Sequence, residues 1–436
     1  MADPRPRDAA CRFLGEAARD YPDLFPRRVD THGLDDRDRR LAEAIVRASV
    51  VRWSTLSTLI DHVLDREWTT IEPKVQGGLL AGAAQLLLLD RVPDHAAVAD
   101  TVEWMKRSRQ GRGVAGMVNA VLRRLVDLRG QRIESADGTT RNELLLADGS
   151  GWRLAEDVFA EEPTRRLAQQ TGHGEFLLTR WFIEHGKEEA TRLALHGLCN
   201  APIIMHGATT EPGLVSHDEA GYHVLEEGQA PADALARHAG AIIQDPAASE
   251  AGRRTIGLKP SVILDYCAGR GTKTLQLASL HPESRVLATE VDASRFEDLA
   301  RLAEQHDRIE AIDPATLRSL DEQIDLLVLD VPCSNTGVLP RRPEARSRFS
   351  AAGLEQLVGI QRQIVADTIP CLAPGAHVLY STCSLEPEEN QAMPAWMKKW
   401  HGWELLDEVF HLPSGQPGDA PTSYHDGGYS ALLRSS

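Results

Sequence analysis

Four short apolar runs in the C-terminal half of the chain restrict its fold more than any other feature. Each run is rich in leucine or β-branched residues, and stretches with helical periodicity separate one run from the next. Strand alternating with helix in this rhythm is typical of βαβ units, which build a parallel sheet covered by helices. Ligands of such sheets bind at the carboxyl ends of the strands. The four runs are SVILDYC (261–267), RVLATEVD (285–292), IDLLVLDVPC (324–333) and AHVLYSTC (376–383).

The N-terminal part of the chain has a different pattern. As far as about residue 128, apolar residues recur at three-to-four spacing, which predicts an all-α domain over residues 1–130. Residues 131–165 contain two Asp-Gly pairs, and we expect a linker with a small hairpin there. Helical stretches and then mixed strands follow in 166–250, a candidate small subdomain, before the α/β region 251–436.

Composition limits the class of protein. The 436 residues are 42% apolar and 26% charged, which is ordinary for a soluble globular protein. No apolar run approaches the ~18 residues that a membrane helix requires, and we see no signal peptide, so we expect a cytoplasmic protein without membrane contact. The six cysteines contain no C-x-x-C pair, which argues against a zinc site and predicts free thiols.

The net charge of −16 argues against non-specific wrapping of a long nucleic acid. It leaves room for RNA binding through a local basic segment. Candidates are KRSRQGR (106–112) and PRRPEARSR (340–348), although either segment could equally be an ordinary solvated surface.

A glycine-containing loop joins the first of the four runs to a helix. In LDYCAGRGTKT (264–274), Gly269 and Gly271 would let the backbone approach a ligand, and the helix N-terminus favours an anionic group. Glu290 follows about twenty residues later at the end of the next run, where an acid can bind ribose hydroxyls. The loop lacks the G-K-[ST] of a phosphate-binding loop, so we expect S-adenosylmethionine, with Asp313 beside its adenine. A tight turn without ligand and a solvated strand end would give the same local pattern.

Two cysteines, Cys333 and Cys383, follow the last two apolar runs and should lie at the same edge of the sheet. Asp330 precedes the first of them in DVPC, and small hydroxyl residues surround the second in STCS. The two thiols are either buried groups that fill space or a nucleophile and its helper. Two thiols, an aspartate and a cofactor loop on one edge favour the second interpretation.

Together these motifs resemble the RNA cytosine-5 methyltransferases of the RsmB (Sun) family. DYCAGRGTKT is similar to the family's cofactor loop, DVPCSNTGV to its D-x-P-C-S-x-T-G motif, and YSTCSLEPEEN to its T-C-S motif. DRVPDHAAVADTVEWMK and GVAGMVNAVLRRL resemble the NusB-like helical domain of these enzymes. The resemblance implies a Rossmann-like, S-adenosylmethionine-dependent methyltransferase domain behind a NusB-like RNA-binding domain, with residues 166–250 as a small RNA-recognition-like subdomain.

By this resemblance, Cys383 is the nucleophile that adds to carbon 6 of a cytosine, and Cys333 helps to release the product. Asp330 holds the pyrimidine edge and also lies at the cofactor, while Lys273 is a positioning residue rather than a base. The implied substrate is 16S ribosomal RNA, bound by a monomer without a metal ion. The loop residues expected to bind the cofactor are Cys267, Ala268, Gly269, Arg270, Gly271, Thr272 and Lys273.

The chain departs from the family pattern in several places. Arg270 and Thr272 replace a proline and a glycine of the usual C-A-A-P-G-G-K loop, and the L-R-V-N segment is changed at residues 204–207. Two other functions therefore stay open. One is a non-enzymatic RNA-binding or assembly factor with a silent methyltransferase domain. The other is a cytosine-5 methyltransferase for transfer RNA or for another ribosomal RNA site.

Overall fold

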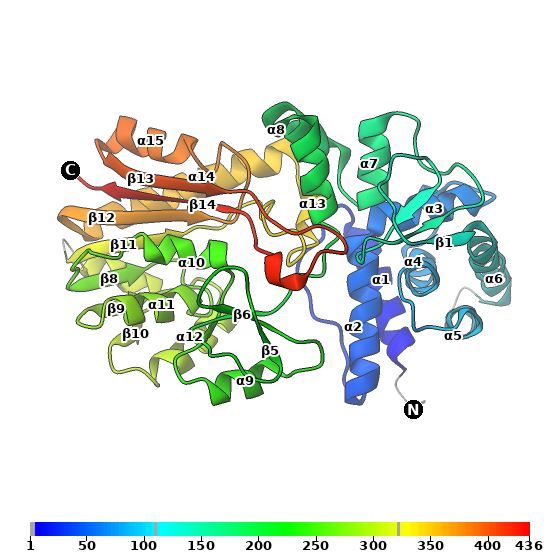
Figure 1. The fold of residues 1–436 in the computed structure, drawn as a ribbon, viewed down its shortest axis with the longest axis horizontal. Helices are drawn as coiled ribbons and strands as arrows, with labels where there is room; N and C mark the ends of the chain where they lie inside the picture. Colours follow the sequence, from blue (N-terminus) through cyan, green and yellow to red (C-terminus); the bar gives the residue numbers. More distant parts are fainter. Residues whose placement is uncertain (1–4, 109–110, 321–322) are drawn as a thin grey trace. The chain divides into compact units, whose positions relative to one another are not determined.

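The computed structural model describes residues 5–108, 111–320 and 323–436, and the chain forms two compact units (Figure 1). The helical unit holds the described residues up to Asn200 together with Leu339–Ser350 and Gln416–Asp419. The sheet unit holds the remaining described residues, from Ala201 to the C-terminus. The segment Leu339–Ser350 is therefore an excursion of the C-terminal half of the chain into the helical unit.

The helical unit is built around α4 (Pro73–Leu87), which is buried on every side from Leu79 to Leu87. Proline suits the first position of this helix, because its fixed φ is helical and the N–H that it lacks would have no partner there. Gly77 allows α1 to approach closely, since a Cβ at Gly77 would lie 2.2 Å from the Gly15 nitrogen. The expectation of a helical N-terminal domain is confirmed. The surrounding helices are α1 (Pro6–Asp20), α2 (Asp36–Val51), α3 (Trp53–Val63), η1 (Trp68–Thr70), α5 (Asp94–Lys106) and α6 (Gly111–Leu128).

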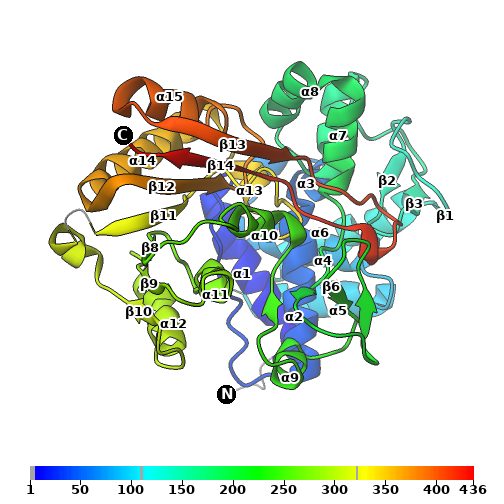
Figure 2. The same cartoon turned by 60° about the vertical axis from the view of Figure 1, so that its left-hand side comes forward.

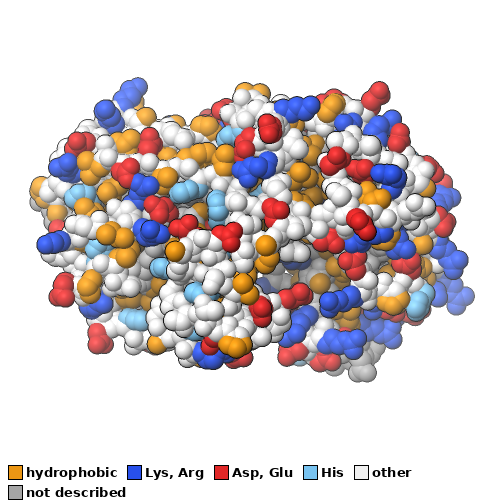
Figure 3. Space-filling model, viewed as in Figure 1, with side chains coloured by type: hydrophobic (Ala, Val, Ile, Leu, Met, Phe, Trp, Pro, Cys, Tyr) orange, Lys and Arg blue, Asp and Glu red, His pale blue; other side chains and the backbone are white. Residues whose placement is uncertain are grey.

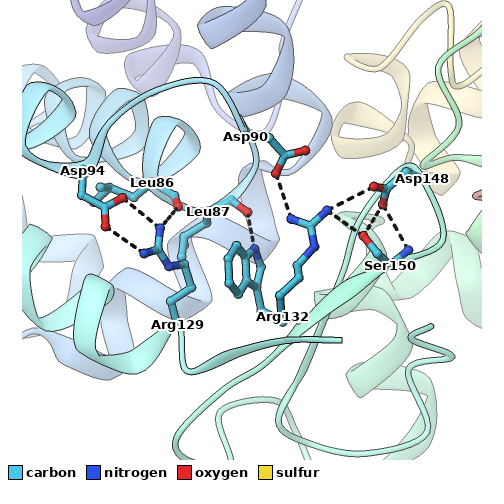
Figure 4. Close-up of polar contacts among 9 residues, drawn as sticks. Leu86, Leu87, Asp90, Asp94, Arg129, Arg132, Asp148 and Ser150 are labelled. Carbon is cyan, nitrogen blue, oxygen red and sulfur yellow. Dashed lines mark hydrogen bonds and ion pairs between the residues drawn. The ribbon is translucent and has the colours of Figure 1, made fainter. Parts of the chain in front are cut away.

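The region expected as a linker contains a small antiparallel sheet with the strand order β1 (Gln131–Ile133), β3 (Gly151–Arg153), β2 (Glu143–Leu145). Trp152 attaches this sheet to the helices (Figure 4): its indole nitrogen donates to the Leu87 carbonyl at 3.1 Å. The guanidinium groups of Arg129 and Arg132 lie 4.8 and 5.1 Å from the centre of its ring, as in cation–π contacts. Arg129 also forms a bidentate ion pair with Asp94. The segment is thus fixed to the helical core by a half-buried ring and charged groups.

Two further helices, α7 (Pro163–Thr171) and α8 (Glu175–His196), and the short α13 (Ala345–Arg348) complete the helical unit. Arg346 in α13 is fully buried. Its guanidinium donates to the carbonyl oxygens of Val51 and Thr171 at 3.1 Å, Gly197 at 2.8 Å and Leu339 at 3.3 Å. A single side chain therefore holds the returning segment to three other parts of this unit.

The sheet unit contains a mixed sheet with the order β10-β9-β8-β11-β12-β14-β13. The first five strands are parallel, as the alternating pattern predicts, but β14 runs antiparallel to both of its neighbours. The expectation of an all-parallel sheet is wrong at this edge. Sequence reasoning missed β13 because most of its side chains are exposed, so ELLDEVFH does not form an apolar run. The strands are β8 (Val262–Asp265), β9 (Arg285–Ala288), β10 (Ile309–Ala311), β11 (Ile324–Asp330), β12 (Leu372–Thr382), β13 (Glu404–His411) and β14 (Gly428–Arg434).

Helices cover both faces of this sheet (Figures 1 and 2). α10 (Pro246–Arg253) and α11 (Thr272–Leu280) pack against Leu326 and Val328 of β11, together with α12 (Ala293–Ala303) on the same side. α14 (Ala351–Thr368) and α15 (Ala392–His401) pack against Leu327 and Leu329 on the opposite face. The two cores alternate along the strand with period two, as expected for a strand buried on both faces. The short helices η3 (Ile369–Cys371) and η4 (Pro421–Ser423) lie in connections.

A second, four-stranded antiparallel sheet precedes the main one, in the order β5 (Leu214–Ser216), β6 (Tyr222–Leu225), β4 (Ile204–His206), β7 (Ile242–Ile243). Together with α9 (Pro231–Arg237) it encloses a small core that includes Met205 and Ala234. The boundary between the units falls at Asn200, inside the 166–250 segment. Among the helices of the described ranges, none has the length and apolar content needed to cross a bilayer.

Candidate active site

The two cysteines predicted to converge do so: the Sγ atoms of Cys333 and Cys383 lie 3.3 Å apart. The register of the sheet produces this contact, because Asp330 at the end of β11 pairs with Ser381 of the parallel strand β12. The two chains then leave the sheet side by side, one toward Cys333 and the other toward Cys383. Cys333 is buried, whereas Cys383 is half-buried and more open to a substrate.

Asn335 holds the loop that carries Cys333. Its amide nitrogen donates to the Cys333 carbonyl at 2.7 Å, and its Oδ1 accepts from the Cys383 thiol at 3.4 Å. Its φ of +62° is the one positive value among the described non-glycine residues. Asparagine tolerates this left-handed conformation better than most residues, and such strain is common at functional sites. The residue therefore links the backbone of Cys333 and the thiol of Cys383 to one turn.

Glu389, which belongs to the acidic run after Cys383, forms hydrogen bonds with the loop that carries Cys333. Its buried carboxylate accepts from the Ser334 backbone nitrogen at 3.0 Å and from the Gln361 amide at 2.9 Å. Gln361 also donates to the Pro332 carbonyl at 3.0 Å. Burial raises the pKa of Glu389, and the hydrogen bonds only partly offset this. Sequence reasoning missed Glu389 and Gln361, although the acidic run EPEEN directly after T-C-S was the available signal.

Further hydrogen bonds join the same two loops. The Leu385 nitrogen donates to Thr336 Oγ1 and the Gly337 nitrogen to the Cys383 carbonyl, both at 2.9 Å. Gly337 is required for this close approach, since a Cβ there would lie 2.7 Å from the Gly427 carbonyl oxygen. The position of one sulfur relative to the other is thus fixed by a network rather than by either loop alone.

Asp330 lies on the same edge with both carboxylate oxygens bonded. Lys273 donates to Oδ2 at 2.8 Å, and the Ser381 hydroxyl donates to Oδ1 at 2.9 Å. Burial lowers the pKa of Lys273, but the ion pair with Asp330 outweighs it and raises that pKa overall. Lys273 is therefore a fixed cation that orients Asp330, which fits a positioning residue and does not fit a base.

Two more acids, Asp265 and Glu290, lie at the carboxyl ends of β8 and β9, beside the ion pair of Lys273 and Asp330. Asp265, Glu290 and Asp330 are called the acidic wall below. Asp265 is fully buried, with Oδ2 accepting from the Thr274 hydroxyl at 2.7 Å and Oδ1 without a partner. Burial raises the pKa of Asp265 to about 7, and the charges of Asp330 and Glu290 contribute to the rise. Three carboxyl groups thus stand near one lysine. An orphaned carboxylate oxygen and excess negative charge suit a cationic ligand.

The glycine loop leaves room for such a ligand. Gly269 has a φ of +59°, with no described atom within 4 Å of where a Cβ would be, whereas Gly271 is the N-cap that precedes α11 and has a φ of +88°. Ala268 is buried and Thr272 opens the helix. Arg270 is exposed and pairs with Asp298 at 3.3 Å. Its side chain is therefore engaged by α12, so the substitution of proline by arginine leaves the turn open.

The structure places the other predicted cofactor residues less centrally. Cys267 is half-buried, and burial raises the pKa of its thiol. Glu290 follows the end of β9, and its carboxylate accepts from the Asp292 backbone nitrogen at 2.9 Å. Asp313 caps η2 (Pro314–Ser319) by accepting from the Ala315 nitrogen, and it follows β10, two strands away from β8.

The strand order changes direction between β8 and β11, and ligands of doubly wound sheets bind at this point. The acidic wall, the open glycine loop and the two sulfur atoms all lie at these strand ends. Fold and site together define a Rossmann-like methyltransferase of the S-adenosylmethionine-dependent class.

Comparison with known proteins identifies the family. Residues 258–420 match the 16S rRNA methyltransferase RsmB/F family model and residues 10–127 match the NusB family model. The ribosomal RNA small subunit methyltransferase B of Xanthomonas campestris is 30% identical over 374 residues, covering 82% of this chain and 78% of that protein. Its counterpart in Cronobacter sakazakii is 27% identical over 379 residues, covering 82% and 81%. The chain belongs to the RsmB/F family with an N-terminal NusB domain and is an S-adenosylmethionine-dependent RNA methyltransferase.

Solved structures share the fold. The crystal structure of PH0851 aligns with a TM-score of 0.70 at 16% identity and covers 99% of both chains. A methyltransferase homolog from Pyrococcus horikoshii aligns with a TM-score of 0.52 at 19% identity, covering 64% of this chain and all of that one. At these identities the likeness concerns the fold alone.

Proposed function

We propose that the protein methylates carbon 5 of a cytosine in 16S ribosomal RNA through a covalent bond between Cys383 and carbon 6 of the base. The observation that carries the proposal is the 3.3 Å contact between Cys333 and Cys383 beside the fixed carboxylate of Asp330. The names of the relatives support the choice of ribosomal RNA. We place the reaction in the cytoplasm, where a reducing environment keeps these thiols free.

Cys383 is the nucleophile in this proposal, because it is the more accessible of the two sulfur atoms. Carbon 5 of cytosine reacts poorly with electrophiles until a thiolate adds to carbon 6 and places electron density on carbon 5. S-adenosylmethionine supplies a methyl group that departs without its bonding electrons. Asp330 accepts from the exocyclic amino group of the cytosine, the usual partner of a carboxylate on this base. Lys273 and Ser381 hold Asp330 in place for that contact.

The thiol protons of Cys383, before the addition, and of Cys333, before the last step, pass to water. Cys333, as a thiolate, then removes the proton from carbon 5. That pair of electrons restores the double bond, the bond between Cys383 and carbon 6 breaks, and the nucleophile leaves as a thiolate. In the free protein, the hydrogen bond with Cys383 and burial raise the pKa of Cys333 well above its ordinary value. Once Cys383 is a neutral thioether, the first of these causes is gone, so Cys333 loses its proton more easily at the stage when a base is needed.

Residues at three strand ends would hold the cofactor. The three acids Asp265, Glu290 and Asp330 outnumber their two cationic partners, Lys273 and Arg295, which suits the positive sulfonium of S-adenosylmethionine. Glu290 is placed for the ribose hydroxyls. Methyl transfer removes the sulfonium charge, so the acidic wall attracts the spent cofactor less and favours its exchange.

Variants of the two cysteines test the mechanism. Cys383→Ala should abolish methylation of 16S ribosomal RNA, because no thiolate then activates the base. Cys333→Ala should instead accumulate a covalent protein–RNA adduct, seen as a shifted band in a denaturing gel, because the carbon 5 proton stays in place. Cys371→Ala removes a buried thiol away from the strand ends and should change neither result. A Cys383→Ala variant with full activity would contradict the assignment.

Titration calorimetry with S-adenosylmethionine separates this function from a silent methyltransferase domain, which should not bind the cofactor. Bisulfite sequencing of ribosomal and transfer RNA from a deletion strain identifies the substrate. Loss of a 5-methylcytosine from 16S ribosomal RNA is expected, whereas loss confined to transfer RNA would favour the alternative substrate.

A further inference from the structure

A cavity of about 640 Å³ lies within the helical unit. Its walls come from α1, the connection between α1 and α2, α2 itself and the returning segment at residues 341–344. Its volume is in the range that accommodates a small organic ligand. Phe13, Leu24 and Val46 contribute apolar surface to it. The strand-end site described above uses none of these groups.

Arginine dominates the charged groups of this cavity. Within the described part of the chain, five arginines line it, against three acids. One acid, Asp20, is already paired with Arg27 at 2.7 Å. The chain as a whole has a net charge of −16, and basic and acidic side chains intermix on the face in Figure 3. A local excess of arginine on such a protein points to an anionic ligand, and guanidinium groups suit phosphates in particular.

An aromatic ring stands beside these charges. Phe25 lines the cavity with 60% of its surface exposed, so its ring is accessible to a ligand. The Arg348 guanidinium lies 5.6 Å from the ring centre, so the ring is held by a cation–π contact. Sites for single-stranded nucleic acid combine such rings, on which bases stack, with a positively charged surface along the backbone.

Glu344 adds a group that can distinguish one base from another. It lines the cavity and is 7% exposed, and its Oε1 has no hydrogen-bond partner among the residues that the structure describes. A buried carboxylate oxygen without a partner is costly, so a ligand that brings an N–H group would be favoured. Adenine, cytosine and guanine each carry an exocyclic amino group, and uracil does not.

From these features we infer that the cavity binds one nucleotide of a single-stranded RNA, with its base stacked on Phe25, its amino group on Glu344 and its phosphates on the arginines. The inference rests on the proposed function, since it takes the RNA substrate as the ligand. It adds a second contact with RNA, separate from the cytosine that reacts. The cavity wall at residues 341–344 follows the Cys333 loop directly in the sequence, so catalytic loop and nucleotide site share one stretch of chain.

Binding of short oligonucleotides to the full-length protein tests the site. Fluorescence anisotropy should show that a hexamer of adenosine binds more tightly than a hexamer of nebularine, the same purine without the amino group. Phe25→Ala should weaken binding of the adenosine hexamer at least about fivefold, the low end for loss of one stacked base. Arg342→Ala should lower the salt dependence of log K by about 0.7, the value for one phosphate contact on a single strand. Glu344→Met should reduce the preference for adenosine over nebularine.

Matched variants outside the cavity serve as controls. Phe176→Ala removes an exposed ring of the same unit, 44% exposed, and Arg66→Ala removes an exposed arginine, so both should bind like the wild type. Thermal unfolding checks that each variant is folded. Unchanged binding of Phe25→Ala, in a protein that methylates RNA, overturns the nucleotide site and leaves the proposed function intact. A wild-type protein that binds no RNA contradicts the proposed function itself. Competition by an oligo-glutamate peptide at equal affinity would show a general anion site and overturn the inference.

Discussion

Asp265 ends β8 as a buried carboxyl group with one oxygen bonded to Thr274 and the other without a partner. Burial raises its pKa to about 7, against an ordinary value of 3.8. Between these values the folded protein keeps a proton that the unfolded chain releases. The free energy of unfolding therefore falls as the pH rises through this window and is constant above it. A charge held at this cost in the interior is typical of a binding site.

Asp265→Asn should remove this pH dependence, because the amide can still accept from Thr274 and never ionises. Urea unfolding at pH 5 and pH 8 should show that the wild type loses more stability than the variant, by at most about 3 kcal/mol, because about two pKa units of the window lie between pH 5 and its upper end. Asp233→Asn changes an exposed aspartate and should follow the wild type. Equal losses in wild type and Asp265→Asn would show that the carboxyl group is already ionised when the protein is folded at pH 5.

At the scale of elements, the site depends on two loops that leave neighbouring parallel strands. The loop after β12 supplies Cys383, the proposed nucleophile, and also Glu389, which binds the backbone and side chain of Ser334 in the loop after β11. Gln361 of α14 binds Glu389 and the Pro332 carbonyl, so a helix from one face of the sheet supports both loops. The acidic run after T-C-S thus has a positioning role.

Glu389→Gln should lower the methylation rate about 10- to 100-fold, because the new amide N–H groups face other donors and displace the Cys333 loop by a fraction of an ångström or more. The affinity for S-adenosylmethionine should stay unchanged, since none of the contacts described for Glu389 involves the cofactor loop. Single-turnover methylation and calorimetry measure the two quantities. Glu388→Gln, at the neighbouring half-buried acid, is the control. A variant at position 389 with the wild-type rate would contradict the positioning role.

At the scale of the whole molecule, the two compact units are not two uninterrupted stretches of chain. Leu339–Ser350 lies in the C-terminal half of the sequence yet belongs to the helical unit, and Arg346 holds it there through four carbonyl oxygens. The same segment begins directly after the Cys333 loop. The folding of the helical unit and the course of the catalytic loop are therefore connected through a short piece of chain.

Arg346→Met should destabilise the protein by at least about 3 kcal/mol, because it leaves several buried carbonyl oxygens without donors. Denaturant unfolding followed by circular dichroism measures the loss. Arg342→Met, at an exposed position of the same segment, should cost less than about 0.5 kcal/mol. If both variants unfold alike, the segment is not held by the buried guanidinium.

The amino-acid sequence alone determined the N-terminal helices, the parallel strands and the strand ends where chemistry is found. Apolar periodicity predicts the helices and the parallel strands, and the motifs place Cys333, Cys383 and Asp330 at one sheet edge, because both signals are local. The sequence did not indicate that β14 lies between β12 and β13, or that Glu389 binds Ser334. It also did not indicate the ion pair between Arg270 and Asp298 or the arginine-lined cavity. Each of these joins residues that are distant in the sequence, and neither periodicity nor a short motif records which distant groups meet. Only the packing of the folded chain decided those contacts.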